Sequence, residues 1–209
     1  RCGRAVSLSG ATLVLDLSGL PVRFRGLDGA LARALASAWA PFITDDRCAP
    51  WLDVELGVSD HAIESDRAMR ASVVGEVREG AGRFRSDEGE IAIDAVGLAR
   101  MRLVRGDDRW RFWGFVNLLA AALAVRMPSR PGGLVHAAGI VIDERAFLLI
   151  GAEGAGKSTF ARLAREGGAR VISDDAVLVD GGEGRLVLLG SPIRAHEATS
   201  LGPGRWPRG

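Results

Sequence analysis

The most informative stretch of the sequence is Gly151-Ala152-Glu153-Gly154-Ala155-Gly156-Lys157-Ser158-Thr159. It follows the apolar run 147–150 and precedes residues 157–166, which have the pattern of a helix. The pattern GxxxxGK[ST] between a strand and a helix is typical of a phosphate-binding loop. The sequence therefore predicts an α/β fold with a nucleoside triphosphate site at this turn.

The residue types in the loop suit a triphosphate. Glycines allow positive φ angles and a close approach, so successive backbone N–H groups can converge on phosphate oxygens at the positive end of a helix dipole. Lys157, the only lysine of the chain, can contact the β and γ phosphates, and the Ser158 hydroxyl is placed to coordinate Mg²⁺. We therefore expect residues 151–159 to bind the nucleotide together with Mg²⁺.

Two carboxylates follow the loop helix closely. The short apolar run Arg170-Val-Ile-Ser173 ends in Asp174 and Asp175, as in a strand that delivers an acid to a metal. One carboxylate can hold Mg²⁺ directly or through water, and the other can accept a proton from an attacking hydroxyl or water. The sequence does not decide which does which, and an Asp pair can also simply open a β-turn.

His136 lies in the apolar segment Leu134-Val-His-Ala-Ala-Gly139, before the two strands that lead into the loop. A single histidine among apolar residues is commonly a hydrogen-bonded core residue, so the sequence leaves this role and a role at the phosphates open. His61 and His196 have no comparable neighbours, and we assign them no role.

Residues 1–128 have the pattern of a smaller α+β region, to which the sequence assigns no role. A hairpin is expected over 11–24 and an amphipathic helix over 27–39, where leucines recur every four residues. Turn residues separate five further strands, 51–58, 71–77, 82–86, 90–95 and 99–105. A second helix over 109–125 ends at the segment Pro128-Ser-Arg-Pro-Gly-Gly133, which marks the expected domain boundary.

Residues 129–209 are expected to form the P-loop nucleotide-binding core. Apolar strands joined by short glycine turns are predicted over 134–142, 146–150, 170–172, 176–179 and 185–189. The last pair flanks the turn Gly181-Gly-Glu-Gly184. Hairpins therefore flank the loop on both sides.

Composition disfavours several other classes of protein. The 27 basic and 26 acidic residues are spread along the chain, so no basic stripe indicates a nucleic-acid or membrane partner. Cys2 and Cys48 lack metal or redox spacing and fit free thiols in a reducing cytosol. The longest apolar run, 115–125, is about half of what a bilayer crossing requires. We expect a cytoplasmic protein, and the sequence leaves open whether it forms a homo-oligomer.

Four segments together resemble a known family: His136-Ala-Ala-Gly139, the loop at 151–159, Ser173-Asp174-Asp175 and Gly190-Ser-Pro-Ile193. Their order and spacing are similar to the nucleotide-binding core of the HPr kinase/phosphorylase family and its serine-kinase-like relatives, over roughly residues 130–195. The resemblance implies a phosphoenolpyruvate-carboxykinase-like mixed sheet in place of an all-parallel one. It also implies that the loop binds the triphosphate and that Asp174 and Asp175 serve magnesium and the transferring proton. By the same resemblance, His136 lies beside the phosphates.

Two features depart from that family. HPr kinases continue with a mobile loop and C-terminal helices that bind the protein substrate, whereas this sequence stops soon after Pro192 and is expected to be truncated. Residues 1–128 match no motif of the HPr kinase regulatory domain, so the resemblance does not imply specificity for HPr.

Two functions follow from these observations. The first is a kinase that uses ATP and Mg²⁺ to phosphorylate a hydroxyl on a protein or peptide. The alternative is a regulatory or scaffold protein that binds the nucleotide without turnover. A transport or motor ATPase is disfavoured because no LSGGQ-like signature is present, and a GTPase because NKxD is missing. The sequence does not determine the preference between ATP and GTP.

Overall fold

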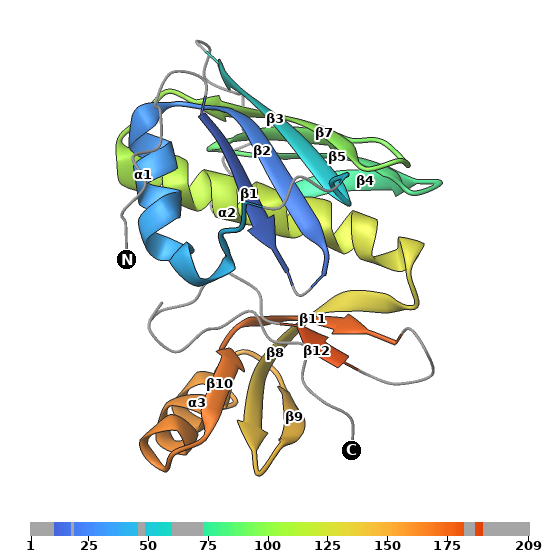
Figure 1. The fold of residues 1–209 in the computed structure, drawn as a ribbon. Helices are drawn as coiled ribbons and strands as arrows, with labels where there is room; N and C mark the ends of the chain where they lie inside the picture. Colours follow the sequence, from blue (N-terminus) through green and yellow to red (C-terminus); the bar gives the residue numbers. More distant parts are fainter. Residues whose placement is uncertain (1–10, 18, 46–48, 60–72, 182–186, 190–209) are drawn as a thin grey trace.

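Two β-sheets and three α-helices make up the described part of the chain, which is a mixed α/β structure (Figure 1). The computed structural model describes residues 11–17, 19–45, 49–59, 73–181 and 187–189. Residues 1–128 supply the larger sheet and two helices, and the strands from residue 132 onward supply the smaller sheet and the third helix.

The larger sheet has seven strands in the order β1-β2-β3-β7-β6-β5-β4. β3 pairs in parallel with β2 and with β7, and the other neighbours are antiparallel. Exposed and buried residues alternate along β6 and β7, which shows that one face of the sheet is packed and the other is open. The strands are β1 Ala11–Asp16, β2 Pro21–Leu27, β3 Leu52–Ser59, β4 Val74–Arg78, β5 Ala81–Ser86, β6 Gly89–Ile93 and β7 Leu98–Val104.

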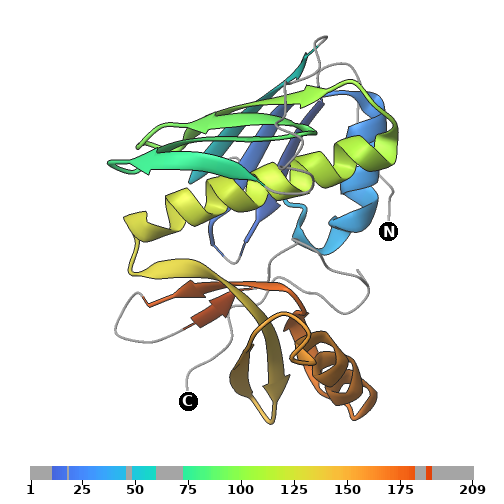
Figure 2. The same ribbon diagram turned by 180° about the vertical axis from the view of Figure 1, so that it is seen from behind.

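Two helices cover the packed face, α1 Gly29–Ala38 and α2 Asp108–Arg126 (Figures 1 and 2). Each begins at an aspartate that accepts hydrogen bonds from first-turn N–H groups, Asp28 for α1 and Asp107 for α2. Between helices and sheet, the rings of Phe24, Trp39 and Phe115 pack together, and the Phe115 centroid lies 5.1 Å from Phe24 and 5.6 Å from Trp39. Burying such a side chain stabilises the fold by about 1.5–3 kcal/mol.

Helix α2 and the turn after it form the single span in the described residues, Asp108–Ser129, that is long and apolar enough to cross a membrane. Half of its most apolar window is buried within the protein, with Phe115, Leu118 and Leu123 in the main core. Its burial is that of a core helix laid across the sheet.

The smaller sheet is built around β8 Gly132–Ile142, which pairs with three other strands, all antiparallel to it. β11 pairs with the first half of β8, whereas β9 and β10 pair with the second half. Helix α3 Lys157–Glu166 packs against β8 and β10. The other strands are β9 Arg145–Ile150, β10 Arg170–Ser173, β11 Ala176–Asp180 and β12 Val187–Leu189.

The main core extends across the expected boundary at residue 128. Ala176 and Leu178 of β11 belong to the same buried cluster as the α1 and α2 side chains, and Leu134 of β8 packs against it. Two smaller clusters lie within the second sheet, one of which joins Ala161 of α3 to Ala138 and Ile140 of β8. The loop between β9 and α3 is therefore carried by a sheet that shares core packing with the first 128 residues.

Each helix and strand expected from the sequence has a counterpart in the described residues, with ends that differ by a few residues. The helices predicted over 27–39, 109–125 and 157–166 correspond to α1, α2 and α3. The boundary between β2 and α1 was wrong, because β2 continues to Leu27 and α1 starts only after its Asp28 cap. Parts of two predicted strands, residues 71–72 and 185–186, and the turn residues 182–184 lie outside the described residues.

Candidate functional site

The loop between β9 and α3 has the backbone conformation that its glycines allow. Gly154 has φ +77° and Gly156 has φ +84°, and a Cβ added at either position would meet nothing within 4 Å. The glycines are therefore required by conformation and not by crowding. Gly156 is also the N-cap of α3 and no side chain caps this end, which leaves the first-turn N–H groups able to serve an anion.

The side chain of Lys157 is held by hydrogen bonds to the backbone of the loop. Its Nζ donates hydrogen bonds to the carbonyl oxygens of Gly151 at 2.8 Å and Ala152 at 3.0 Å. Gly151 and Ala152 therefore act through their carbonyls, which position the ammonium group at the start of α3. The ammonium group therefore lies against the loop 151–159.

Ser158 connects the start of α3 to the turn between β10 and β11. Its Oγ donates a hydrogen bond to the main-chain oxygen of Asp174, 3.2 Å away. The turn itself is shaped by Ser173, which is fully buried and whose Oγ accepts from the N–H groups of Ala176 at 3.3 Å and Asp175 at 3.5 Å. Sequence reasoning gave Ser173 no role, although a serine before two aspartates is a recognisable turn signal.

His136 lies beside Asp175. It belongs to β8 and pairs in register with Ala176, the neighbour of Asp175. Its Nδ1 is 3.1 Å from Asp175 Oδ1, and its side chain is 57% exposed. His136 is therefore not a core histidine, which was one of the two roles that the sequence left open.

These residues line one cavity of about 400 Å³, a volume within the usual range for small-molecule sites. The cavity brings together β8, the loop and the β10–β11 turn, which are far apart in the sequence. Of the predicted site residues, Gly151, Ala152 and Asp174 do not line it. The residues that do are His136, Glu153, Gly154, Ala155, Gly156, Lys157, Ser158, Thr159 and Asp175.

The donor set fits a magnesium ion that arrives with a nucleotide. Among the described residues, no group of three or more His, Cys, Asp or Glu side chains could hold a metal. Mg²⁺ keeps several waters and commonly takes one hydroxyl or carboxylate from the protein plus phosphate oxygens. Ser158 Oγ at the loop and Asp175 in the same cavity supply those ligand types, and Asp174 adjoins them.

Comparison with protein-family models, with curated proteins and with solved structures finds no match to this chain. The chemistry of the site therefore has to be argued from its own residues.

Proposed function

We propose that this chain is a kinase that uses ATP and Mg²⁺ to phosphorylate a hydroxyl on a protein or peptide. The observation that carries the proposal is the shared cavity, in which an uncapped helix start, Lys157 and Ser158 face Asp175 and His136. A phosphate loop alone supports only binding. The Asp175 carboxylate in the same cavity adds a group that can take up a proton.

Each residue has a role in this proposal. The N–H groups at the start of α3 and the Lys157 ammonium bind the phosphates, and Ser158 with Asp174 would hold the magnesium ion, which would neutralise charge on the phosphate oxygens. Asp175 accepts the proton of the acceptor hydroxyl as its oxygen bonds to the γ-phosphorus and the bond from that phosphorus to ADP breaks. His136 holds the Asp175 carboxylate in place.

We assign the base role to Asp175 because its side chain lines the cavity and lies 3.1 Å from His136 Nδ1. Asp174 is the preceding residue of the same turn, and its main-chain oxygen accepts a hydrogen bond from Ser158. This position suits a metal ligand beside the serine, directly or through water.

The strand pairing around the loop supports a phosphoenolpyruvate-carboxykinase-like sheet of the HPr-kinase-like type. β9, which leads into the loop, is antiparallel to β8, and β8 is antiparallel to both β10 and β11. All-parallel sheets of the doubly wound type lack such neighbours around their phosphate loop. The order of His136, the loop and the Asp pair along the chain agrees with the same family.

The test uses the full chain, ATP labelled at the γ position, Mg²⁺ and an oriented peptide library with serine or threonine at one fixed position. We expect label in the serine- or threonine-containing peptides, none in an alanine-substituted library, and loss of transfer in Asp175→Asn. If a fluorescent ATP analogue binds but no label is transferred, the alternative of a regulatory or scaffold protein is favoured. If no triphosphate binds with Mg²⁺, both functions fail.

A further inference from the structure

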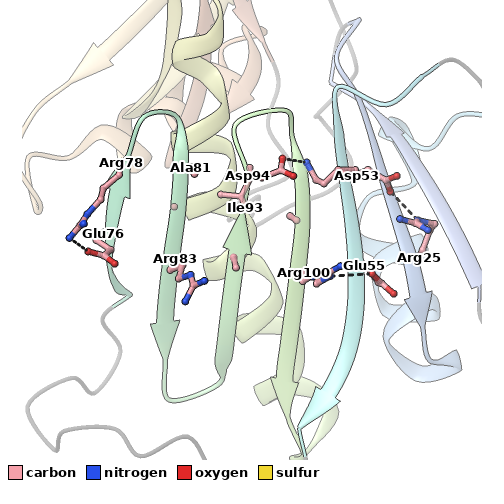
Figure 3. Close-up of a pocket in the computed structure, with 14 residues that line it drawn as sticks. Arg25, Asp53, Glu55, Glu76, Arg78, Ala81, Arg83, Ile93, Asp94 and Arg100 are labelled. Carbon is pink, nitrogen blue, oxygen red and sulfur yellow. Dashed lines mark hydrogen bonds and ion pairs between the residues drawn. The ribbon is translucent and has the colours of Figure 1, made fainter.

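The open face of the larger sheet holds two hollows, which share no lining residue with the cavity at the loop 151–159. One has a volume of about 550 Å³ and the other about 650 Å³. They share Glu76, Arg83, Ala92 and Arg100, so they form one continuous depression on this face. Figure 3 shows its charged side chains standing on neighbouring strands.

Strand register arranges these side chains in rows across the sheet. We use "central row" for Arg25, Glu55, Arg100, Ala92, Arg83 and Glu76, each of which pairs in register with the next. Three arginines and two glutamates leave the central row with one positive charge in excess. At about 4.8 Å between strands, the five steps of the row span about 24 Å.

A second row of side chains on the same face has a carboxylate between two arginines, which the centre of the central row lacks. There, Glu90 of β6 pairs in register with Arg102 of β7 and Arg85 of β5, and its Oε1 lies 3.9 Å from Arg102 Nη1. Two residues further along β6, on the same face, Ala92 stands between Arg100 and Arg83 in the same way. The central row thus has two arginines around a position that carries no carboxylate.

The two arginines at this position are available for a ligand. Arg83 forms no ion pair with any other described residue, and Figure 3 shows it beside β6 without a partner. Arg100 makes only a long contact with Glu55, 3.7 Å, in which both side chains are well exposed. Exposed pairs of this kind contribute little, so Arg100 can exchange Glu55 for a ligand at small cost.

The space above the small Ala92 side chain, between Arg83 and Arg100, is called the notch below. We propose that the notch binds the carboxylate of an acidic residue in an extended peptide segment. Arginines on both sides can grip a carboxylate with charge-assisted hydrogen bonds. The central row is about 24 Å long, which is the length of about seven extended residues at about 3.3 Å each. A small dicarboxylate would cover only part of this length. Glu55, Glu76 and Glu90 on the same face would repel a phosphate backbone, so nucleic acid is disfavoured.

The inference does not rest on the proposed kinase function, because no residue of the central row lines the nucleotide cavity. A peptide bound here can be the phospho-acceptor or a separate partner. Either would be recognised by the same contacts.

The experiment is a selection of phage-displayed heptapeptides on the full chain, followed by fluorescence anisotropy with a fluorescein-labelled copy of a selected peptide. We expect selected sequences to share Asp or Glu at one fixed position. Replacing that residue by Asn or Gln should weaken binding by about tenfold or more, as should Arg83→Gln or Arg100→Gln. Arg33→Gln removes a matched exposed charge on α1 and should leave affinity within about twofold.

Ala92→Glu gives the sharpest test because it fills the notch with the protein's own carboxylate, as Glu90 does in the next row. The variant should no longer bind the peptide. Its melting temperature should equal or exceed that of the parent, because the new glutamate can pair with the arginines on both neighbouring strands. Ala92→Gln separates the effect of charge from that of bulk and should block less strongly. Selected peptides without a fixed acidic residue, or equal binding by Ala92→Glu, overturn the proposal. So does binding of a twelve-nucleotide oligothymidylate that displaces the peptide.

Discussion

The hydroxyl of Ser158 donates a hydrogen bond to the main-chain oxygen of Asp174, 3.2 Å away. This contact joins the first turn of α3 to the turn that carries both aspartates, across 16 residues of chain. The loop 151–159 and the acid pair are therefore positioned relative to each other by the protein itself. A ligand bound at the loop therefore also lies close to the turn that carries the aspartates.

Ser158→Ala should weaken binding of a fluorescent ATP analogue in the presence of Mg²⁺ by about tenfold, because it removes both the metal ligand type and the contact to Asp174. Binding measured in EDTA should change much less. Ser158→Thr retains the hydroxyl and should recover most of the affinity. Equal Mg²⁺-dependent affinity in the alanine variant would contradict the magnesium assignment.

Lys157→Ala should lower triphosphate affinity by about tenfold to a hundredfold, since it removes the one ammonium group that the Gly151 and Ala152 carbonyls hold at the loop. Isothermal titration calorimetry with ATP and Mg²⁺ measures the change. Arg162→Ala serves as the control, because Arg162 lies on the same helix but pairs with Glu166 at 2.8 Å and does not line the cavity. If the two variants bind alike, the phosphate site has been misplaced.

Asp175→Asn should bind ATP nearly as the parent does and yet transfer phosphate more slowly by about 10²–10⁴-fold, because the amide cannot take up the acceptor proton. Single-turnover transfer and equilibrium binding measure the two effects separately. His136→Gln should give a smaller loss, since it removes only the group that positions the carboxylate. If Asp175→Asn transfers phosphate at the parental rate and Asp174→Asn transfers it slowly, Asp174 is the base and Asp175 the metal ligand.

Gly156→Ala should destabilise the protein by about 1–2 kcal/mol, because φ +84° is costly for a residue with a Cβ even where space is open. Gly133→Ala is a matched control, since its added Cβ also meets nothing within 4 Å but its φ is not positive. The control should stay within about 0.5 kcal/mol of the parent. Urea unfolding followed by circular dichroism measures the stability of both variants. Equal stabilities would show that position 156 does not require a glycine.

Asp53→Asn should reduce stability at neutral pH by about 1–3 kcal/mol. Asp53 is buried in β3, and hydrogen bonds from Arg23, together with Arg25, hold the pKa of its carboxyl below the ordinary value although burial opposes ionisation. Because the folded-state pKa is lowered, this contribution is complete above the unfolded value of about 3.9 and is lost as pH falls through the folded value.

The measurement for Asp53 is urea unfolding at pH 7, 5 and 3. The gap between parent and Asp53→Asn should be largest at pH 7 and 5 and should shrink towards pH 3, because the carboxylate of the unfolded chain is protonated below about pH 3.9. Glu76→Gln provides the exposed comparison, because its pair with Arg78 is solvent-exposed and should contribute little at any pH. A gap that is independent of pH would mean that Asp53 stabilises the sheet by its shape and not by its charge.

The elements of this fold were largely predictable from the sequence because their signals are local. The loop between β9 and α3 and the helix Lys157–Glu166 follow from a glycine pattern and a 3.6-residue period that need no distant partner. The strand pair β5 and β6 follows from alternation around the turn at Asp87 and Glu88. The start of α1 was missed because a leucine can continue a strand or begin a helix, and the Asp28 cap decides between them.

The order and approximate positions of the strands and helices, and the glycine-rich loop at 151–159, could thus be predicted from local sequence patterns. Three relationships became visible only in the folded protein: His136 lies beside Asp175, β11 joins the main core, and Ala92 falls between Arg83 and Arg100. The physical reason is that strand order and register depend on packing between segments far apart in the chain, and shifting a register by one residue turns every side chain to the opposite face.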